Sequence, residues 1–254
     1  MREGLLTDQI LTLGGLVLMS LAHIWGYRIS RLDTIKTRGW VSFSAGASVA
    51  YVFMHVFPEV GLFQQQLFGH GETASFIKEQ LYLAALSGLC FLFLLDSIEQ
   101  HLINENVDPA KPYRHFLKLF WLRSILYGLY NLMVAYMITE KPASDMVNLL
   151  LIAVALMLHF IVLNTGFSED YGIYYQKYVR WLAVVGLFLG WILGIFTALP
   201  DEIIATCFAI IGGMITYVAL KYELTETENQ APLHFLAGVV LYSLIILTIL
   251  FFDH

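Results

Sequence analysis

Charged residues are scarce in this sequence. Lys, Arg, Asp and Glu make up 13% of its 254 residues, whereas a soluble domain carries about 25%. Hydrophobic residues make up 58%, and this composition excludes a soluble enzyme and a disordered chain. The few basic residues leave a net charge of −6. That charge argues against nucleic acid as a partner, because nucleic-acid-binding proteins carry clustered basic residues.

Cysteine and nucleotide-binding glycine patterns are also lacking. The two cysteines, Cys90 and Cys207, lie inside apolar segments. We expect small buried side chains there, and neither a disulfide scaffold nor a thiolate metal site. The glycine pairs at 14–15 and 212–213 lack the strand and the Lys-Ser/Thr sequence of a phosphate-binding loop. We expect these glycines to allow close packing of helices instead.

The chain does contain long apolar segments. Each is close to the roughly 20 residues that a helix needs to cross the hydrocarbon of a bilayer. They are apolar on all sides rather than alternating, which favours helices over barrel strands. We expect an all-α, polytopic membrane protein in which residues 1–254 form a single transmembrane domain within a lipid bilayer. The predicted spans are 9–27, 39–58, 79–97, 117–138, 146–165, 179–199, 202–222 and 233–252.

The number of spans and the basic residues together predict the topology. Pro200 separates the sixth and seventh spans, and their combined length is enough for two crossings, so we count eight spans rather than seven. An even number places both termini on one side of the membrane. Eleven of the fourteen Lys and Arg residues lie in or beside the loops on the other side, leaving three. Because basic loops stay cytoplasmic, we expect both termini outside, in a plasma or inner membrane.

Ionisable side chains inside a bilayer cost about 2.5–3.5 kcal/mol each, so their positions are informative. Most acids lie near the ends of spans, where we expect them to be solvated: Asp96, Glu99, Asp201, Glu202 and Glu223. Fewer polar side chains lie deep in the spans: His23, His55, Asn131, His159 and Asn164. These deep groups are the candidates for a functional site.

His55 and Glu59 lie near the outer end of the second span. They are four residues apart with Pro58 between them, so a helix places them on one face. Imidazole and carboxylate groups both bind zinc. The pair is therefore either half of a metal entry site or a polar pair that marks the end of the helix.

His159 lies deep in the fifth span. A lone histidine on an apolar helix is usually hydrogen-bonded to a neighbouring backbone or hydroxyl group. Tyr127, Tyr130 and Asn131 of the fourth span are candidate partners, and Tyr127 and Asn131 share a helix face. Asn164 is five residues beyond His159, so the two side chains do not share a face.

Two spans carry a recognisable pattern. The second contains FSAG at 43–46 and HVFPE at 55–59, and the seventh contains FAIIGGMITYVAL at 208–220. These segments resemble the F-x-A-G, H-x-x-P-E and F-A-x-x-A-G-x-x-x-Y-V-x-L segments of the ZIP (Zrt/Irt-like) family of metal-ion permeases, and residues 234–252 resemble the final span of that family. The resemblance implies an eight-helix ZIP-like bundle with both termini outside, which forms a homodimer.

The resemblance fails at the residues that hold metal in the family. Family members place a His and a carboxylate four residues apart in the fourth span, where this chain has Tyr127 and Asn131. Of the His-Glu-x-Pro-Glu pattern in the fifth span, only His159 is kept, and the bridging acid of the sixth span falls on Leu-Gly-Trp at 189–191. An imidazole, an amide and a phenol lack the negative charge that a dehydrated divalent ion needs. We therefore expect the binuclear zinc site of the family to be missing.

Three functions remain open from the sequence. The first is a ZIP-like protein that is not a standard zinc permease and moves another solute, or has a regulatory or structural role. The second is a variant divalent metal-ion transporter of the zinc or iron type, with a pathway formed by His55, Glu59, Tyr127, Tyr130, Asn131 and His159. The third, a haem or redox protein, is disfavoured because membrane haem needs two facing histidines. A zinc hydrolase is disfavoured because its histidine spacings are absent, so we do not expect an enzyme.

Overall fold

The computed structural model describes residues 2–30, 35–68, 80–105, 112–140, 146–224 and 231–252. Within these ranges every regular element is a helix, so the all-α prediction is confirmed. A helix covers most of the described part of each predicted span, and the last residues of the sixth predicted span, 197–199, lie beyond the end of α7. The elements are α1 (Arg2–Ser30), α2 (Ile35–Tyr51), η1 (Val52–Val56), α3 (Phe57–Phe68), α4 (Gln80–Glu105), α5 (Pro112–Glu140), α6 (Met146–Tyr171), η3 (Tyr175–Val179), α7 (Arg180–Phe196), α8 (Asp201–Leu224) and α9 (Pro232–Phe252).

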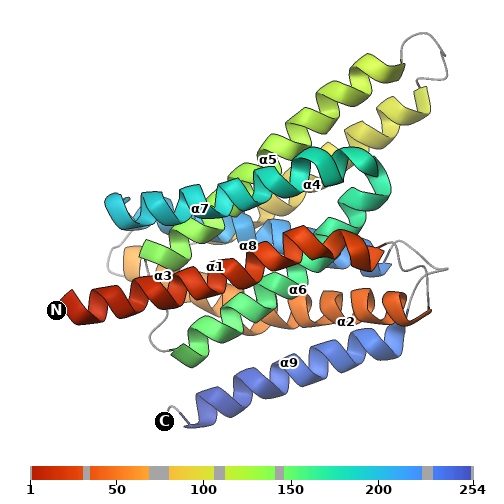
Figure 1. The fold of residues 1–254 in the computed structure, drawn as a ribbon. Helices are drawn as coiled ribbons and strands as arrows, with labels where there is room; N and C mark the ends of the chain where they lie inside the picture. Colours follow the sequence, from red (N-terminus) through yellow and green to blue (C-terminus); the bar gives the residue numbers. More distant parts are fainter. Residues whose placement is uncertain are drawn as a thin grey trace.

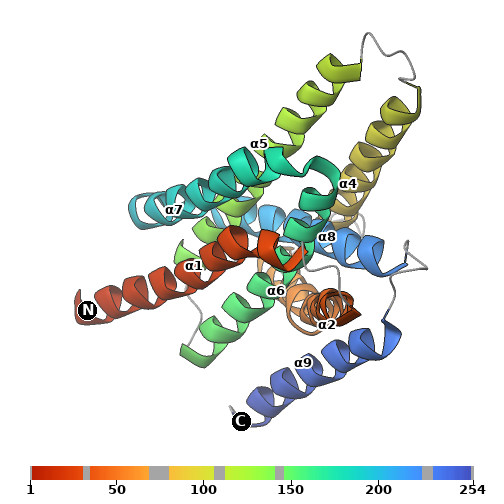
Figure 2. The ribbon, with the colours of Figure 1, turned by 45° about the vertical axis from the view of Figure 1, so that its right-hand side comes forward.

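The helices pack mainly in pairs that are distant in the sequence. The most extensive contacts join α5 with α7, α2 with α9, α4 with α8, and α1 with α6. Helices α2, α6 and α8 also contact one another and so hold the pairs together. Figures 1 and 2 show α9 at the edge of the bundle beside α2, and the ends of α4 and α5 projecting from it. In Figure 1, α1 begins and α9 ends at the same end of the bundle, and the side of the membrane that this end faces stays a prediction.

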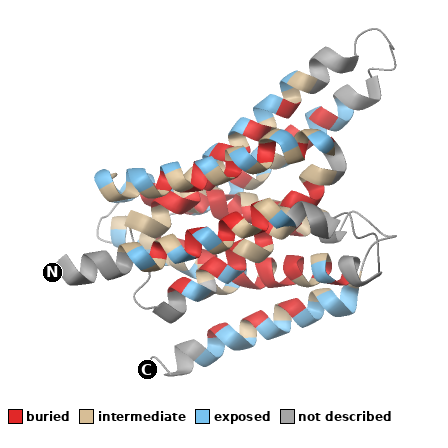
Figure 3. Ribbon diagram, viewed as in Figure 1, coloured by how far each residue is buried: buried red, intermediate tan, exposed pale blue. Residues whose placement is uncertain are grey.

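The outer surface of the bundle is apolar. Phe196 is 79% exposed, Leu233 is 78% exposed and Ile10 is 67% exposed. Figure 3 shows buried residues in the centre of the bundle and exposed ones along the outer helices. Cys90 lies on this exposed surface of α4, so its predicted burial is wrong. Such a surface is typical of a protein that is solvated by lipid rather than by water.

Four helical segments are long and apolar enough to cross a membrane. They are Gly39–Leu67, Gln80–His101, Tyr175–Phe196 and Asp201–Lys221. Shorter apolar stretches lie at Gln9–Trp25, Ile152–Ser168 and Pro232–Thr248 among the residues that could be assessed. An integral membrane protein is compatible with this set, whereas the crossing of the membrane by all eight predicted spans stays a prediction.

Glycine residues allow several of the paired helices to touch backbone to backbone. A Cβ atom on Gly213 of α8 would overlap the carbonyl oxygen of Ala85 in α4, and one on Gly190 of α7 would overlap that of Leu132 in α5. The close packing predicted at 212–213 is thus confirmed. The same prediction is wrong for Gly14, because nothing lies within 4 Å of a Cβ built there.

The helix of the second predicted span extends beyond the end that the sequence predicted. Helices α2, η1 and α3 form one continuous rod that runs through Pro58 to Phe68. In η1 the backbone widens to a π-helical turn, in which the N–H of Phe57 donates to the carbonyl of Val52. Proline has no N–H to donate and its ring crowds the preceding turn, and π-turns commonly absorb such interruptions. The helix therefore continues ten residues beyond residue 58, and the position at which the span leaves the membrane stays a prediction.

Two predicted junctions have different outcomes. The polar segment predicted to separate the fifth and sixth spans, 168–177, is largely helical, because α6 runs to Tyr171 and η3 begins at Tyr175. Gly172 makes the turn between them with a φ of 49°, a conformation that glycine adopts without strain. The short junction predicted at Pro200 is confirmed, since α7 ends at Phe196 and α8 begins at Asp201.

Candidate functional site

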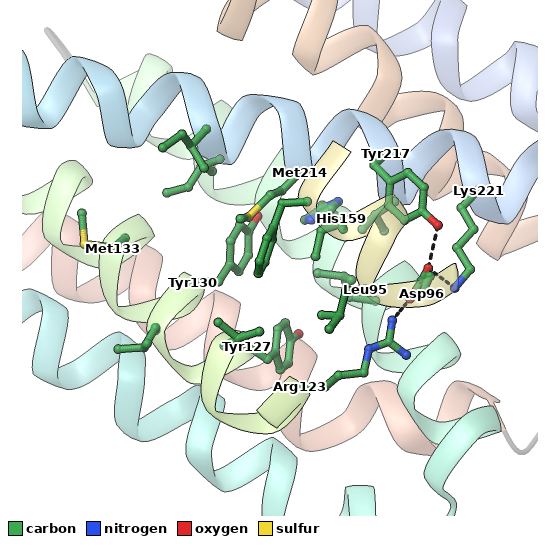
Figure 4. Close-up of a pocket in the computed structure, with 18 of the residues that line it drawn as sticks. Leu95, Asp96, Arg123, Tyr127, Tyr130, Met133, His159, Met214, Tyr217 and Lys221 are labelled. Carbon is green, nitrogen blue, oxygen red and sulfur yellow. Dashed lines mark hydrogen bonds and ion pairs between the residues drawn. The ribbon is translucent and has the colours of Figure 1, made fainter. Parts of the chain in front are cut away.

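A cavity of about 240 Å³ lies between α4, α5, α6 and α8. Its walls are largely apolar, with side chains that include Leu92, Leu95, Leu126, Met133, Leu163 and Met214. Figure 4 shows that charged side chains gather at one side of the cavity, whereas Tyr130 and Met133 lie away from them. Concave, mostly apolar spaces with a few polar groups are typical of small-molecule sites.

Two polar atoms in the cavity wall are buried without a partner. The hydroxyl of Tyr130 and Nδ1 of His159 make no hydrogen bond to any described part of the chain. Their rings lie side by side, with centroids 6.1 Å apart, and both residues line the cavity. An unpartnered buried polar atom is destabilising by about 1–3 kcal/mol. The pair therefore marks the place where a polar group of a bound molecule would be stabilised.

Asp96 of α4 anchors the charged side of the cavity. Its carboxylate forms an ion pair with Arg123 of α5. It also accepts hydrogen bonds from Lys221 Nζ at 2.5 Å and from the Tyr217 hydroxyl at 2.7 Å, both in α8. Asp96 is only 5% exposed. The sequence-based expectation of a solvated acid at this position is wrong.

Glu99 extends the same cluster by one helical turn. It pairs with Arg123 and accepts a hydrogen bond from the hydroxyl of Tyr171 in α6. Burial raises the pKa of the Tyr171 phenol, which keeps the phenol a donor. Glu99 is 7% exposed, so its predicted solvation is also wrong. The three-residue spacing of the two acids placed them on one helix face, and this spacing was the signal that sequence reasoning missed.

The other acids of that prediction have mixed outcomes. Asp201 and Glu202 are exposed in the first turn of α8, which agrees with the expected solvation and suits the positive end of a helix dipole. The side chain of Glu223 lies outside the residues described. The structure thus separates solvated acids at the start of α8 from paired acids on α4.

A second polar cluster surrounds His23 of α1. Nε2 of His23 lies 2.8 Å from Oδ1 of Asn131, and Nδ1 lies 3.2 Å from Oδ1 of Asn164. The Tyr127 hydroxyl donates to Oδ1 of Asn164 at 3.1 Å and also lies 3.3 Å from Nδ1 of His23. His23 and both asparagines are 0% exposed. The cluster ties α1 to α5 and α6 in the centre of the bundle.

The partners predicted for His159 are thus divided between two histidines. Tyr127 and Asn131 share a helix face as predicted, but they face His23 rather than His159. Tyr130 lies beside His159. Sequence spacing gave no signal for this division, because His23 lies 108 residues from Asn131 and 141 residues from Asn164.

His55 of the second span packs against an aromatic ring rather than among other possible metal ligands. The His55 ring stacks on Tyr51, with centroids 5.3 Å apart and planes 26° from parallel. His55 and Glu59 are both half-buried. Among the described residues, no group of three or more His, Cys, Asp or Glu side chains is placed to hold a metal ion. A metal role for His55 and Glu59 stays a prediction.

The donors around His159 do not suit a dehydrated divalent cation. Zinc takes about four ligands, usually including thiolate, imidazole or carboxylate groups. His159 has the Tyr130 phenol beside it, whereas the amide of Asn131 is engaged by His23 and by the carbonyl of Tyr127. Of the cavity-lining residues, Asp96 carries a carboxylate, and that carboxylate is already bound by Arg123 and Lys221.

Replacing Tyr130 by phenylalanine is expected to stabilise the protein. The change removes a buried hydroxyl that has no partner among the described residues, so the free energy of unfolding should rise by about 1 kcal/mol. Tyr127→Phe, three residues earlier on the same helix, removes a hydroxyl bonded to Asn164 and should lower it by about 1 kcal/mol. Denaturant titration of both variants in detergent measures the difference. Equal effects of the two substitutions on stability would contradict the conclusion that the Tyr127 hydroxyl is hydrogen-bonded and the Tyr130 hydroxyl is not.

Asp96→Asn is expected to lower the free energy of unfolding by about 3 kcal/mol, because Lys221 loses the buried carboxylate that it contacts and Arg123 loses one of the two acids with which it pairs. Glu202→Gln, at an exposed acid, is the matched control and should change stability by less than about 1 kcal/mol. The same titration measures both. A loss for Asp96→Asn no larger than that of the control would show that the cluster does not stabilise the bundle.

No family model matches this chain, and no curated protein matches it. The coarse description that the structure supports is an all-α protein with helices long and apolar enough to cross a membrane. This description is compatible with an integral membrane protein.

Proposed function

We propose that this chain is a membrane transporter of ZIP-like fold whose cavity takes a small uncharged solute in place of a divalent metal ion. The ZIP-like assignment is supported by the patterns at 43–59 and 208–220. The predicted topology, with both termini outside, and the homodimer belong to the same proposal. The replacement of metal ligands by neutral side chains sets the chain apart from a standard zinc permease.

The observation that carries the proposal is the pair of unpartnered atoms in an apolar wall. A hydroxyl group on a solute can donate to one of Tyr130 Oη and His159 Nδ1 and accept from the other, since phenol and imidazole both serve as donor or acceptor. The surrounding wall is aliphatic and aromatic, with Phe91 and Phe167 among its members. The site therefore favours an apolar molecule that carries one hydroxyl.

The size of the cavity limits the solute further. An engineered cavity of about 150 Å³ holds a benzene molecule, and this cavity is about 240 Å³. A single ring with a short substituent fits within that space. Charged solutes are disfavoured because Tyr130 and His159 offer only neutral groups. At the far side the two acids, Asp96 and Glu99, already balance the charges of the two bases, Arg123 and Lys221.

The proposal predicts that benzyl alcohol binds about tenfold more tightly than toluene, because only the alcohol bonds to Tyr130 and His159. Benzylamine, which is protonated at neutral pH, should not bind. Binding is measured as the rise in the free energy of unfolding with probe concentration in detergent, from which Kd follows.

Tyr130→Phe and His159→Leu should each remove most of the preference for the alcohol and leave toluene binding unchanged. Partition of the probes into micelles is the same for every variant, so it cancels in the comparison. The proposal fails if wild-type protein binds toluene and benzyl alcohol equally, or if the preference survives in both variants.

A further inference from the structure

Both ring nitrogens of His23 face oxygen atoms. Nε2 lies 2.8 Å from Oδ1 of Asn131, and Nδ1 lies 3.2 Å from Oδ1 of Asn164. Amide oxygens can only accept hydrogen bonds. An imidazole that carries one proton can donate to one of these oxygens, and its other nitrogen then presents a lone pair to the second.

The orientation of the two amides is fixed by the backbone. Nδ2 of Asn131 donates to the carbonyl of Tyr127 at 2.8 Å, and Nδ2 of Asn164 donates to the carbonyl of Ala22 at 3.0 Å. A carbonyl oxygen cannot donate, so turning either amide over would place two acceptors against each other. The oxygens therefore face His23, and the assignment rests on contacts beyond the histidine itself.

A count of protons shows that the neutral cluster is one donor short. Neutral His23 has one N–H donor and one acceptor nitrogen, the two asparagines present two acceptor oxygens, and Tyr127 adds one O–H. Three acceptors then compete for two protons. With a second proton on the ring, both nitrogens donate and each amide oxygen receives a bond, while the Tyr127 hydroxyl donates to Asn164.

We infer that His23, clamped between Asn131 and Asn164, is a proton-binding site inside the bundle. The ring takes one proton from solution at its free nitrogen and becomes an imidazolium ion, and it returns that proton when it becomes neutral again. The His23 ring does not line the solute cavity, and the inference does not depend on the function proposed for that cavity.

Burial of His23 disfavours a charge on the ring, and two features of its surroundings oppose that cost. Charge-assisted hydrogen bonds to the two amide oxygens are about twice as strong as neutral ones, and the Phe160 ring lies with its centroid 4.5 Å from that of His23, where it can contribute a cation–π interaction.

The titratable groups placed against His23 come from three elements: Tyr127 of α5, His159 of α6 and Tyr175 of η3, whose hydroxyl donates to the His23 carbonyl. Arg180, at the start of α7, carries a positive charge that interacts electrostatically with Tyr175. All of these are neutral or basic groups, so the charge on His23 is held by the amides rather than by a carboxylate in the described part of the chain.

Protonation of His23 affects the cavity through the hydrogen bonds of Tyr127. In the neutral state the Tyr127 hydroxyl is needed as a donor to Nδ1 of His23, and in the protonated state it donates to Asn164. Tyr127 also lines the cavity. The change of partner therefore alters both the wall of the cavity and the bonds that tie α1 to α6.

The test is nitrogen NMR of the full chain labelled at histidine, in nanodiscs, between about pH 8 and about pH 4. The ring ¹⁵N shifts distinguish the neutral tautomers from the imidazolium ion, and His23→Gln and His159→Gln assign the signals. His159 is the internal control, because it is almost as deeply buried but its Nδ1 has no partner in the part of the chain that the structure describes. His23 should take up its second proton at least one pH unit above His159, which is about tenfold tighter binding.

Two variants are expected to act in opposite directions. Asn164→Leu removes one of the two amide oxygens to which the charged ring donates at the same time, so proton binding should weaken by about tenfold. Tyr127→Phe removes the donor that the neutral ring needs, so proton binding should tighten. Circular dichroism and size-exclusion chromatography confirm that each variant is folded, and the wild-type titration suffices if one is not. The inference is overturned if His23 stays neutral wherever His159 does, or if both variants shift proton binding in the same direction.

Discussion

Polar side chains inside this bundle must find partners within the protein, because hydrocarbon offers none. The chain satisfies this constraint at two places. One is the cluster of His23, Asn131 and Asn164, which joins α1 to α5 and α6. The other is the ion-pair cluster of Asp96 and Arg123, which joins α4 to α5 and, through Lys221, to α8. Between them lies a cavity in which the Tyr130 hydroxyl and Nδ1 of His159 have no hydrogen-bond partner among the described residues.

The helix packing explains why charge and cavity are separated. Helices α4 and α8 touch closely at Gly213, and α5 and α7 touch closely at Gly190. These tight pairs meet each other less extensively, along α4, α5 and α8, and the cavity occupies that looser boundary. The ion pairs at one side of it hold the boundary together, while the neutral groups of α5 and α6 determine what the space can bind.

The fold was more predictable from the sequence than the site. Uniform apolar segments predicted the all-α structure and the positions of the helices, because the length and apolar character of a segment are evident from its own residues. Local signals were misleading at Pro58, where a π-turn continues the helix, and at 168–177, which is largely helical apart from the turn at Gly172. The acids Asp96 and Glu99 were expected in solvent because no local feature reveals that Arg123 packs against them from another helix.

The polar residues of the site were identified from the sequence, but their pairing was not. His23, Asn131, His159 and Asn164 were recognised as deep, because depth follows from position within an apolar segment. Tyr127 and Asn131 of α5 contact His23 of α1 rather than His159 of α6. This choice depends on how the three helices are rotated about their axes. One sequence does not specify that rotation, since α1 and α6 carry apolar residues on nearly all sides.

The central claim is that the membrane interior of this protein offers neutral groups at the position where a metal carrier would offer carboxylates. Anomalous diffraction at the zinc edge, from crystals of the full chain soaked in zinc, tests this claim most directly. The account predicts no zinc peak between α5 and α6. An ordered zinc ion at about 2.0–2.1 Å from a ring nitrogen of His159, with further ligands from α5, would contradict it.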